Sequence, residues 1–558
     1  MRILYMTNYP APYRVDFFNK LGEKCDLTVT FEESPAMQKH RDTSWFCENY
    51  KNFNAVFLKK SITRNGHLLM STQIFTELKK KYDAIIVGIY STGTSMAAIA
   101  YMKIHQISYW IETDGGMIKE ENAIKRRVKK MLISGATGYF SPSIGADEYL
   151  SFYGADANKI HRYPFTSLTN ADIKNALILS KQQKQNLRFK LNMTESKVLL
   201  SVGRFSYKGG YGKGYDTLLE VAEKLSPDIG IYIVGDKPTN EFIEWKKEKN
   251  LTHVHFIGCK GKTELAEYYA AADAFVLLTR GDVWGLVVNE AMSFGLPIIT
   301  TYQCVAGKEL VKEGKNGYLV NAGDSEKTEA AIKMLFGQSE EDYETMRINC
   351  FDVIKNYSIE NMTIEHFDVL GRGEKREILK MYERFVVLYV GQIIYRKGID
   401  ILLLAARKLP NEIGVYLVGG NPTAEYLEMI KAYNITNVHF EGFKNKKELE
   451  SYYRAADMFV LPTREDVWGL VINEAMAFGL PCISTNKCGA ALELIENEKT
   501  GYILENLDAD SLCKKILDLY QDDRKRKNMQ VECLKKISRY TIENMAQAHV
   551  AVLKDDRI

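Results

Sequence analysis

The 558-residue sequence lacks several features that would place it in a specialised class of protein. Its nine cysteines include no Cys-x-x-Cys pair and are odd in number, which favours reduced thiols over a disulfide framework or a zinc site. The start, MRILYMTNYP, has no apolar core of the kind found in signal peptides. The most apolar stretch, 84–102, is interrupted by the polar segment 90–95, so no membrane span is expected there. These absences predict a cytoplasmic protein.

A strong net charge is also missing. The net charge of +3 is too small to indicate a nucleic-acid partner. Residues 1–190 contain 27 Lys and Arg against 17 Asp and Glu, whereas the remainder contains 47 against 54. Apolar residues make up 46%, as in globular proteins, and at about 150 residues per domain the length predicts three to four domains. We therefore expect several packed lobes, of which the N-terminal one is basic.

An internal repeat accounts for much of this length. The segment TRGDVWGLVVNEAMSFGLP (279–297) recurs as TREDVWGLVINEAMAFGLP (463–481), and the surrounding 250–300 matches 434–484 at 35 of 51 positions. The similarity extends over two segments, the first repeat (195–366) and the second repeat (384–549). The predicted domains are an N-terminal lobe (1–190), a lobe with the first repeat (191–370), a charged linker (371–384) and a lobe with the second repeat (385–558).

Short apolar runs alternate with helix-like segments in each of these parts. Examples are RILYMT (2–7) and SYWIET (108–113) in the N-terminal lobe, and VLLSVG (198–203) and AFVLLT (274–279) in the first repeat. Alternating strands and helices predict right-handed crossovers and parallel sheets. Continuously apolar strands indicate sheets covered on both faces. The predicted fold class is therefore α/β, with three Rossmann-like lobes built on doubly wound parallel sheets.

The loop from residue 203 to residue 214 of the first repeat carries residues suited to an anionic ligand. Ligands of doubly wound sheets bind where the strands end, and this loop follows a predicted strand. It contains Arg204, Lys208 and Lys213 among glycines that allow close approach of the backbone, a combination that suits a diphosphate. The alternative is a flexible, solvated loop. No GxxxxGK[ST] sequence occurs, which disfavours a P-loop nucleoside triphosphatase.

A second loop of this repeat precedes a predicted helix. Gly285, Leu286 and Val287 are expected to open that helix, where free N–H groups and the helix dipole favour a phosphate. Asp282 lies on the loop, and Glu290, about one turn into the helix, can accept two vicinal hydroxyls such as those of a ribose. The alternative is that Asp282 caps the helix and Glu290 is a surface charge.

Four further segments are candidates for function. In the N-terminal lobe, ETDGG (112–116) follows the strand SYWI, and its Asp114 is either a catalytic carboxylate or a turn-forming residue. The turns 235–239 and 256–258 either recognise a base or are ordinary connections. Lys125-Arg-Arg-Val-Lys-Lys130 begins a basic helix, which either docks on anionic lipid or is a solvated face.

The motifs of the first repeat resemble those of a known family. The Gly-Arg strand end, the Lys-Gly that follows it and the carboxylates eight positions apart before EAMxxGxP resemble the retaining glycosyltransferases of the GT-B fold (glycosyltransferase family 4, group 1 type). That signature is usually Glu-x7-Glu, whereas here Asp282 is the first member and Val283 replaces a glycine. The loop TNYPAPYR (7–14) is Pro-rich where the family often has glycines.

The resemblance implies a nucleotide sugar on the repeated lobe, an acceptor on the N-terminal lobe and transfer in the cleft between them. It implies a UDP- or GDP-sugar as co-substrate, no metal or other cofactor, a glycan or lipid-linked acceptor, and peripheral attachment at the inner face of the membrane. The implied donor contacts are Arg204 and Lys213, with Lys208 as a spare, for the diphosphate, the N–H groups of Gly285, Leu286 and Val287 for its distal phosphate, Glu290 for the ribose and Asp282 for the donor sugar. Asp114 stands where relatives often place a histidine near the reacting carbon.

The second repeat is the part that this resemblance does not explain. It keeps donor-like residues at Arg396, Lys397, Asp466 and Glu474, but has Gln392 where the first repeat has Arg204. The segment 371–384 is too short to hold another acceptor-side lobe. Three alternatives follow: an accessory nucleotide-binding lobe, two repeats that share one N-terminal lobe in turn or across a dimer, or a fusion remnant without catalysis. A GT-B nucleotide-sugar epimerase is the alternative enzyme.

Overall fold

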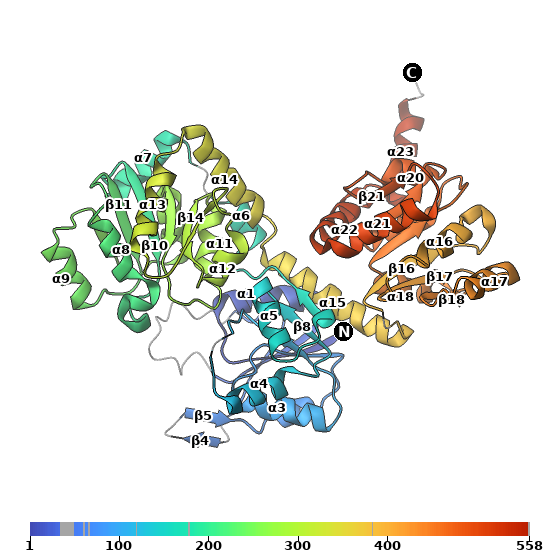
Figure 1. Ribbon diagram of the computed structural model, residues 1–558, viewed down its shortest axis with the longest axis horizontal. Helices are drawn as coiled ribbons and strands as arrows, with labels where there is room; N and C mark the ends of the chain where they lie inside the picture. The colour runs from blue at the N-terminus through green and yellow to red at the C-terminus, as the bar shows by residue number, and fades with distance from the viewer. Residues whose placement is uncertain are drawn as a thin grey trace. The chain divides into compact units, whose positions relative to one another are not determined.

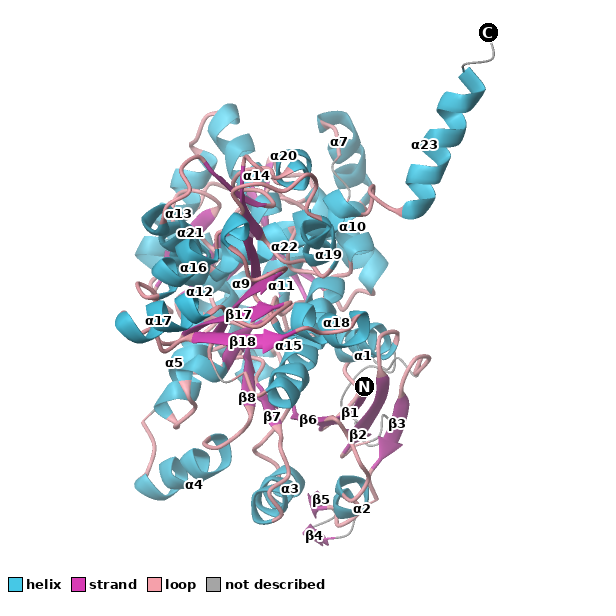
Figure 2. Cartoon of the chain, turned by 90° about the vertical axis from the view of Figure 1, so that its right-hand side faces the viewer, coloured by secondary structure: helices cyan, strands magenta, loops and turns pink. Residues whose placement is uncertain are grey.

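The computed structural model describes residues 1–33, 49–59, 62–64, 67–118, 120–176, 179–381 and 383–555. The chain forms two compact units, residues 1–368 and residues 369–558 (Figure 1). Each sheet is enclosed between helices, as Figure 2 shows for the magenta strands and cyan helices. The cysteines among the described residues are free thiols, and Cys47 lies outside the described residues.

The N-terminal lobe of the first unit contains a seven-stranded parallel sheet of order β3-β2-β1-β6-β7-β8-β9. Its strands are β1 (Arg2–Thr7), β2 (Asp26–Phe31), β3 (Asn54–Phe57), β6 (Ala84–Val87), β7 (Trp110–Glu112), β8 (Gly138–Ser141) and β9 (Ile160–Arg162), with a separate hairpin of β4 (Ile62–Arg64) and β5 (His67–Met70). Its helices are α1 (Pro12–Gly22), α2 (Ile74–Leu78), α3 (Gly93–Ile104), α4 (Ala123–Ile133), α5 (Ile144–Phe152), η3 (Ala157–Lys159) and α6 (Asn170–Lys174). The strands predicted at 2–7 and 26–31 are confirmed, and they pair in parallel.

The first repeat forms a six-stranded parallel sheet of order β12-β11-β10-β13-β14-β15. Its strands are β10 (Lys197–Val202), β11 (Ile229–Val234), β12 (Val254–Ile257), β13 (Ala274–Leu277), β14 (Ile298–Thr301) and β15 (Gly317–Val320). Its helices are η4 (Tyr207–Lys213), α8 (Tyr215–Ala222), α9 (Asn240–Glu248), α10 (Lys262–Ala271), α11 (Leu286–Ser293), α12 (Val305–Leu310), α13 (Ser325–Phe336), α14 (Glu340–Ile354) and α15 (Ile359–Leu379). The strands are buried on both faces, which explains their continuously apolar sequence.

The second repeat forms a sheet of the same order, β18-β17-β16-β19-β20-β21. Its strands are β16 (Phe385–Val390), β17 (Ile413–Val418), β18 (Val438–Gly442), β19 (Met458–Leu461), β20 (Cys482–Thr485) and β21 (Gly501–Leu504). Its helices are η5 (Tyr395–Lys397), α16 (Ile399–Ala406), α17 (Ala424–Ala432), α18 (Lys446–Ala455), α19 (Leu470–Ala477), α20 (Gly489–Leu494), α21 (Ala509–Gln521), α22 (Asp523–Ile537) and α23 (Ile542–Asp555). The fold class is therefore α/β with three Rossmann-like lobes, as predicted.

The structure differs from the sequence-based picture at both predicted boundaries. Helix α7 (Lys181–Lys190), which the prediction puts in the N-terminal lobe, packs on the first repeat, because Lys184 and Arg188 pair with Asp273 at 2.8 and 2.5 Å. Most of the predicted linker is helical, since α15 continues to Leu379. The Glu, Lys, Arg and Leu residues of this segment favour a helix and outweigh its two glycines.

Candidate active site

A buried ion-pair network lies where strand β7 of the N-terminal lobe ends. Arg14 of α1 donates through Nη1 to Oε1 of Glu112 at 2.5 Å and to the hydroxyl of Tyr5 at 3.2 Å. Its other terminal nitrogen pairs with Asp114, whose second oxygen accepts from the Tyr13 hydroxyl at 3.4 Å. Arg14 and Glu112 are fully buried, whereas about a third of the Asp114 side chain is exposed. The candidate carboxylate Asp114 is therefore held at the edge of a buried cluster.

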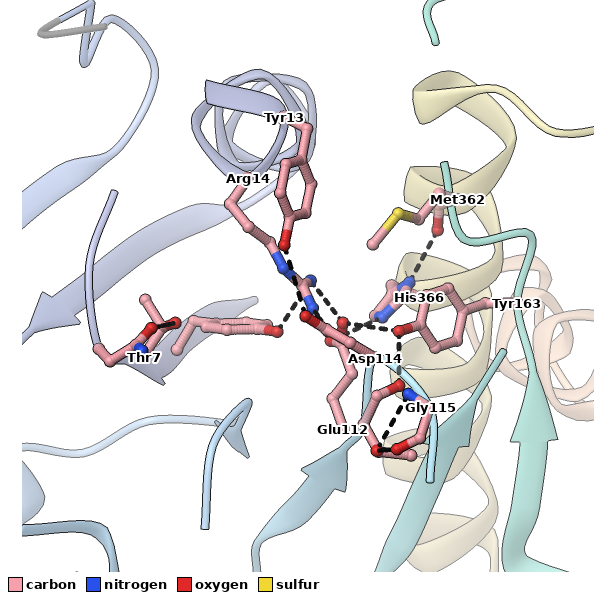
Figure 3. Close-up of polar contacts among 12 residues, drawn as sticks. Thr7, Tyr13, Arg14, Glu112, Asp114, Gly115, Tyr163, Met362 and His366 are labelled. Atoms are coloured by element: carbon pink, nitrogen blue, oxygen red, sulfur yellow. Dashed lines mark hydrogen bonds and ion pairs between the residues drawn. The ribbon is translucent and has the colours of Figure 1, made fainter. Parts of the chain in front are cut away.

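The C-terminal helix of the first repeat completes this network. His366 of α15 contacts Oε2 of Glu112 through Nε2 at 3.0 Å, and its Nδ1 lies 2.8 Å from the carbonyl oxygen of Met362. Figure 3 shows Arg14 and His366 converging on Glu112. Tyr163 donates to the same carboxylate at 3.1 Å. Glu112 thus joins the two lobes of the first unit through one buried charge.

The network sets the protonation of its two carboxyl groups in opposite directions. Burial alone would raise the pKa of Glu112, but the Arg14 guanidinium and His366 outweigh it and hold this pKa well below its usual range. Burial raises the pKa of Asp114 although Arg14 opposes the shift, and the charge on Glu112 adds to the rise. Glu112 is therefore a permanent anion, while Asp114 is the more basic of the two.

The Asp114 loop lies directly against the Asp282 loop of the first repeat. Gly115 has a φ of +144°, and a Cβ atom there would lie 2.1 Å from the carbonyl oxygen of Val283, so only glycine fits. Next to this contact, the rings of Phe165 and Trp284 meet edge to face with centroids 5.5 Å apart. The two predicted catalytic carboxylates therefore sit on adjacent loops.

Lys213 and Asp282, singled out separately in the sequence, form an ion pair with Nζ and Oδ2 2.5 Å apart. Both are largely shielded from solvent. Gly214, which follows, has a φ of +74° and starts α8 against the carbonyl oxygen of Leu278. The pair fixes a lysine ammonium group between the ends of β10 and β13.

The loop of residues 282–285 leads into α11 as predicted. Gly285 is its N-cap with a φ of +103°, and a Cβ atom there would lie 2.6 Å from Sγ of Cys304. Burial raises the pKa of this cysteine to about 12, which keeps the thiol neutral. Leu286 and Val287 are the first helical residues, and N–H groups in a first turn have no carbonyl partner within the helix. This helix end therefore offers donors and a partial positive charge beside Lys213.

Glu290 lies one turn into α11 and faces hydroxyl groups. Its Oε1 accepts from Ser167 of the N-terminal lobe and its Oε2 accepts from Tyr269 of α10, both at 3.0 Å. Burial raises its pKa although both hydroxyls oppose the shift. The surroundings of Glu290 suit the binding of hydroxyl groups.

The remaining predicted cations are less constrained. Arg204 and Lys208 are exposed. The Lys208 ammonium lies 5.6 Å from the ring centroid of Tyr207, as does that of Lys213. The predicted base-recognition turn 235–239 contributes Asp236, whose carboxylate accepts from the N–H of Ser206 at 3.1 Å. That contact ties the turn to the Arg204 loop.

The second repeat reproduces most of these local contacts. Lys397 pairs with Asp466, and Glu474 accepts from the Tyr453 hydroxyl at 2.8 Å, while Arg396 is exposed. A cavity of about 310 Å³ lies here. Its lining residues are Val390, Gly391, Lys397, Leu461, Asp466, Trp468, Gly469, Leu470 and Val471.

Two further searches cover only the described part of the chain. There, no group of three or more His, Cys, Asp and Glu side chains is arranged to hold a metal ion. Nor does any described helix combine the length and apolar character needed to cross a bilayer. The basic segment 125–130 falls on α4, whose Ile124 and Met131 are also exposed.

The sequence analysis missed Arg14, Glu112 and His366 as members of the site. Two signals were available: a glutamate ending a buried strand requires a partner, and His366 recurs as His549 in the second repeat. Tyr269, which also recurs, was missed for the same reason.

Comparison with known proteins gives a family match. The family model described as “Glycosyl transferases group 1” matches residues 183–350 and 371–533, which together are more than half of the chain. The sulfoquinovosyl transferase SQD2 of Arabidopsis thaliana is 32% identical over 163 residues, which are 29% of this chain and 30% of the relative. A GDP-mannose-dependent alpha-(1-6)-phosphatidylinositol monomannoside mannosyltransferase of Mycobacterium tuberculosis is 30% identical over 168 residues, 28% of this chain and 43% of the relative. The chain spans half or less of the length of such curated relatives.

Solved structures support the fold. Anabaena HepE in complex with UDP has a TM-score of 0.53 at 16% identity, covering 66% of this chain and 99% of that one. Sucrose-phosphate synthase of Thermosynechococcus elongatus has a TM-score of 0.53 at 18% identity, covering 68% of this chain and 100% of that one. These similarities show the GT-B architecture.

Proposed function

The chain belongs to the group 1 glycosyl transferases, and from this premise we propose that it moves a hexose from a nucleotide-diphosphate sugar to a surface glycan or glycolipid, with retention at the transferred carbon. The donor class is supported by HepE, which has been solved with UDP and with UDP-glucose, and by the mannosyltransferase named as GDP-mannose-dependent. The base is therefore proposed as uracil or guanine.

The observation that carries the proposal is the meeting of the Asp114 loop with the Asp282 loop. Gly115 touches the backbone of Val283, so Asp114 lies at the boundary of the two lobes. The Lys213–Asp282 pair and the first turn of α11 stand on the other side of that boundary. Carboxylates, a fixed cation and helix N–H groups are thus gathered at the carboxyl ends of the strands, where such folds bind ligands.

In the proposed mechanism the first repeat stabilises the leaving group. Negative charge grows on the distal phosphate as the bond to the sugar breaks, and pre-positioned donors stabilise that transition state. Lys213, held by Asp282, and the N–H groups of Leu286 and Val287 are placed for this role. Arg204, exposed on its loop, adds charge when a diphosphate binds. We propose that these groups serve without a metal ion.

Glu290 and Asp114 take the two ends of the donor. Glu290, already surrounded by hydroxyl donors, is proposed to bind the ribose, with Asp282 directed at the hexose hydroxyls. Asp114, raised in pKa and partly exposed, is proposed to face the reacting carbon and the acceptor. The second repeat is proposed as a duplicate donor lobe that uses Lys397 and Glu474.

Nucleotide binding tests the assignment of sites. Glu290→Ala removes hydrogen bonds from a carboxylate to a ribose, so we expect UDP or GDP to bind its site roughly ten- to a hundredfold more weakly. Glu474→Ala is the matched control and should weaken only the second site. Calorimetric titration of both variants with UDP and GDP measures this. Unchanged titrations in both variants would refute the placement of the nucleotide.

A separate measurement tests transfer. Free nucleotide should be released from the sugar donor only when a glycan or glycolipid acceptor is added. Interconversion of nucleotide sugars without an acceptor would instead show an epimerase, and binding without either reaction would show a scaffold protein.

The basic helix α4 is proposed to hold the protein on the inner face of the membrane. Lys125, Arg127 and Lys130 are exposed beside the apolar Ile124 and Met131. Each cation near an anionic surface contributes about 1 kcal/mol, so changing all three to Glu should weaken binding to phosphatidylglycerol vesicles by about a hundredfold or more. Vesicle co-sedimentation measures the effect, with neutral phosphatidylcholine as the blank. The matched control changes three lysines of α9 and its end, Lys246, Lys247 and Lys249. Equal loss in both variants would argue against a specific role for α4.

A further inference from the structure

We infer that the second repeat carries a preserved docking surface for an N-terminal lobe, and that its occupant is the lobe of a second copy of this chain. The inference comes from comparing equivalent positions of the two repeats. It concerns association only and does not depend on the proposed transfer reaction.

In the first unit, polar contacts seat the N-terminal lobe on the first repeat. Glu309 of α12 lies 3.3 Å from Nη1 of Arg162 and accepts from the N–H of Ile144 at 3.1 Å. Lys262 of α10 lies 2.8 Å from Oδ1 of Asp172. These contacts lie on both sides of the candidate active site.

Helix α15 supplies the rest of this seat. Its Glu360 accepts from the N–H of Asn170 at 2.8 Å, and His366 contacts the buried Glu112 at 3.0 Å. Ile359 donates its N–H to the carbonyl oxygen of Leu168 at 2.8 Å. The first two turns of this helix are therefore part of the lobe interface.

The second repeat keeps the same residue types at these positions. Lys446 corresponds to Lys262, Glu493 to Glu309, Glu543 to Glu360 and His549 to His366. Even the local geometry matches, because Nδ1 of His549 lies 2.8 Å from the carbonyl oxygen of Met545. Within its own unit Glu493 accepts from Tyr540, and it is exposed on α20. A complete set of lobe-binding side chains has thus been retained.

The apolar part of the surface is retained as well, but it is uncovered. The exposed fractions are 78% for Ile542, 57% for Met545 and 39% for Trp468, against 0% for Ile359, 1% for Met362 and 3% for Trp284. Figure 2 shows α23 projecting beyond the other elements of its unit. Large apolar side chains gathered on one face mark an interaction surface.

The pattern of charges selects the occupant. A partner must offer a cation to Glu493, an anion to Lys446 and a buried carboxylate to His549, which are what Arg162, Asp172 and Glu112 offer in the N-terminal lobe. The docking face of that lobe is covered by the first repeat within its own unit. Two copies can therefore fill the second surface by exchanging lobes, in which equivalent contacts replace one another at low cost. The exchange would place Asp114 of one copy beside Asp466 of the other.

Reversing one charge in the first seat tests this inference. In Glu309→Arg the new cation faces Arg162 and the N–H of Ile144, so the lobe should leave the first repeat and occupy Glu493 of another copy. We expect the dimer association constant of the full chain to rise roughly tenfold or more over wild type, measured by sedimentation equilibrium. Adding Glu493→Arg should return the chain to the monomer.

A second route guards against misfolding of that variant. Arg162→Glu combined with Glu493→Arg favours the second seat with opposite charges and should also dimerise, whereas Arg162→Glu with Glu309→Arg should stay monomeric. A monomeric Glu309→Arg chain whose circular dichroism matches wild type would overturn the inference, and it would leave the surface to a different partner or to none. A dimer that persists after Glu493→Arg would also overturn it.

Discussion

Replacing Lys213 with alanine is expected to lower the rate of sugar transfer by about two to three orders of magnitude, the usual effect of losing one pre-positioned donor to a developing negative charge. Lys213 is shielded from solvent and fixed by Asp282, so its charge needs no reorganisation during the reaction. The measurement is kcat for acceptor-dependent release of nucleotide at saturating donor. The affinity for the donor should change less, because most of the charge appears only in the transition state.

The chain contains matched controls for this prediction. Lys397→Ala removes the equivalent ion pair of the second repeat and should leave kcat close to wild type if the first unit is the catalytic one. Lys208→Ala removes an exposed cation of the same loop and should have only a small effect. A kcat that falls for Lys397→Ala but not for Lys213→Ala would place catalysis in the second repeat.

The sequence predicts much of the fold because its signals are local. Continuous apolar runs bounded by glycines define the strands at 2–7 and 26–31, and the glycine before Leu286 marks the start of α11. Parallel strands bring their carboxyl ends to one edge of a sheet, so Lys213 and Asp282 can each be assigned to that edge from the order of the elements alone.

The network around Glu112 cannot be derived in this way. Its partners Arg14 and His366 lie 98 and 254 positions away, and no local pattern specifies their meeting. The close approach of Gly115 to Val283 likewise depends on how two lobes pack. In the predicted linker, helix propensity was outweighed in the interpretation by two glycines that the helix tolerates.

Glu112→Gln is expected to destabilise the first unit by about 3–5 kcal/mol, because removing one partner of a buried ion pair leaves the other charge uncompensated. Arg14 and His366 both lose their shared anion, although Arg14 keeps Asp114. Calorimetric unfolding of the full chain measures the effect, and the second unit is its internal control because no residue of the network belongs to it. His549→Ala, at the exposed position equivalent to His366, should leave both transitions unchanged.

The pH dependence gives the same prediction a second readout. Because the pKa of Glu112 is lower in the folded chain than in the unfolded chain, its contribution is fully present above the unfolded value of about 4.3 and is lost as the pH falls towards the folded value. The wild-type first unit should therefore lose stability below about pH 4 more steeply than Glu112→Gln, which has no carboxyl group to protonate at this position. The two curves should converge in acid, where the wild-type network is also broken. Parallel curves would mean that Glu112 is not the buried anion that joins the lobes of this unit.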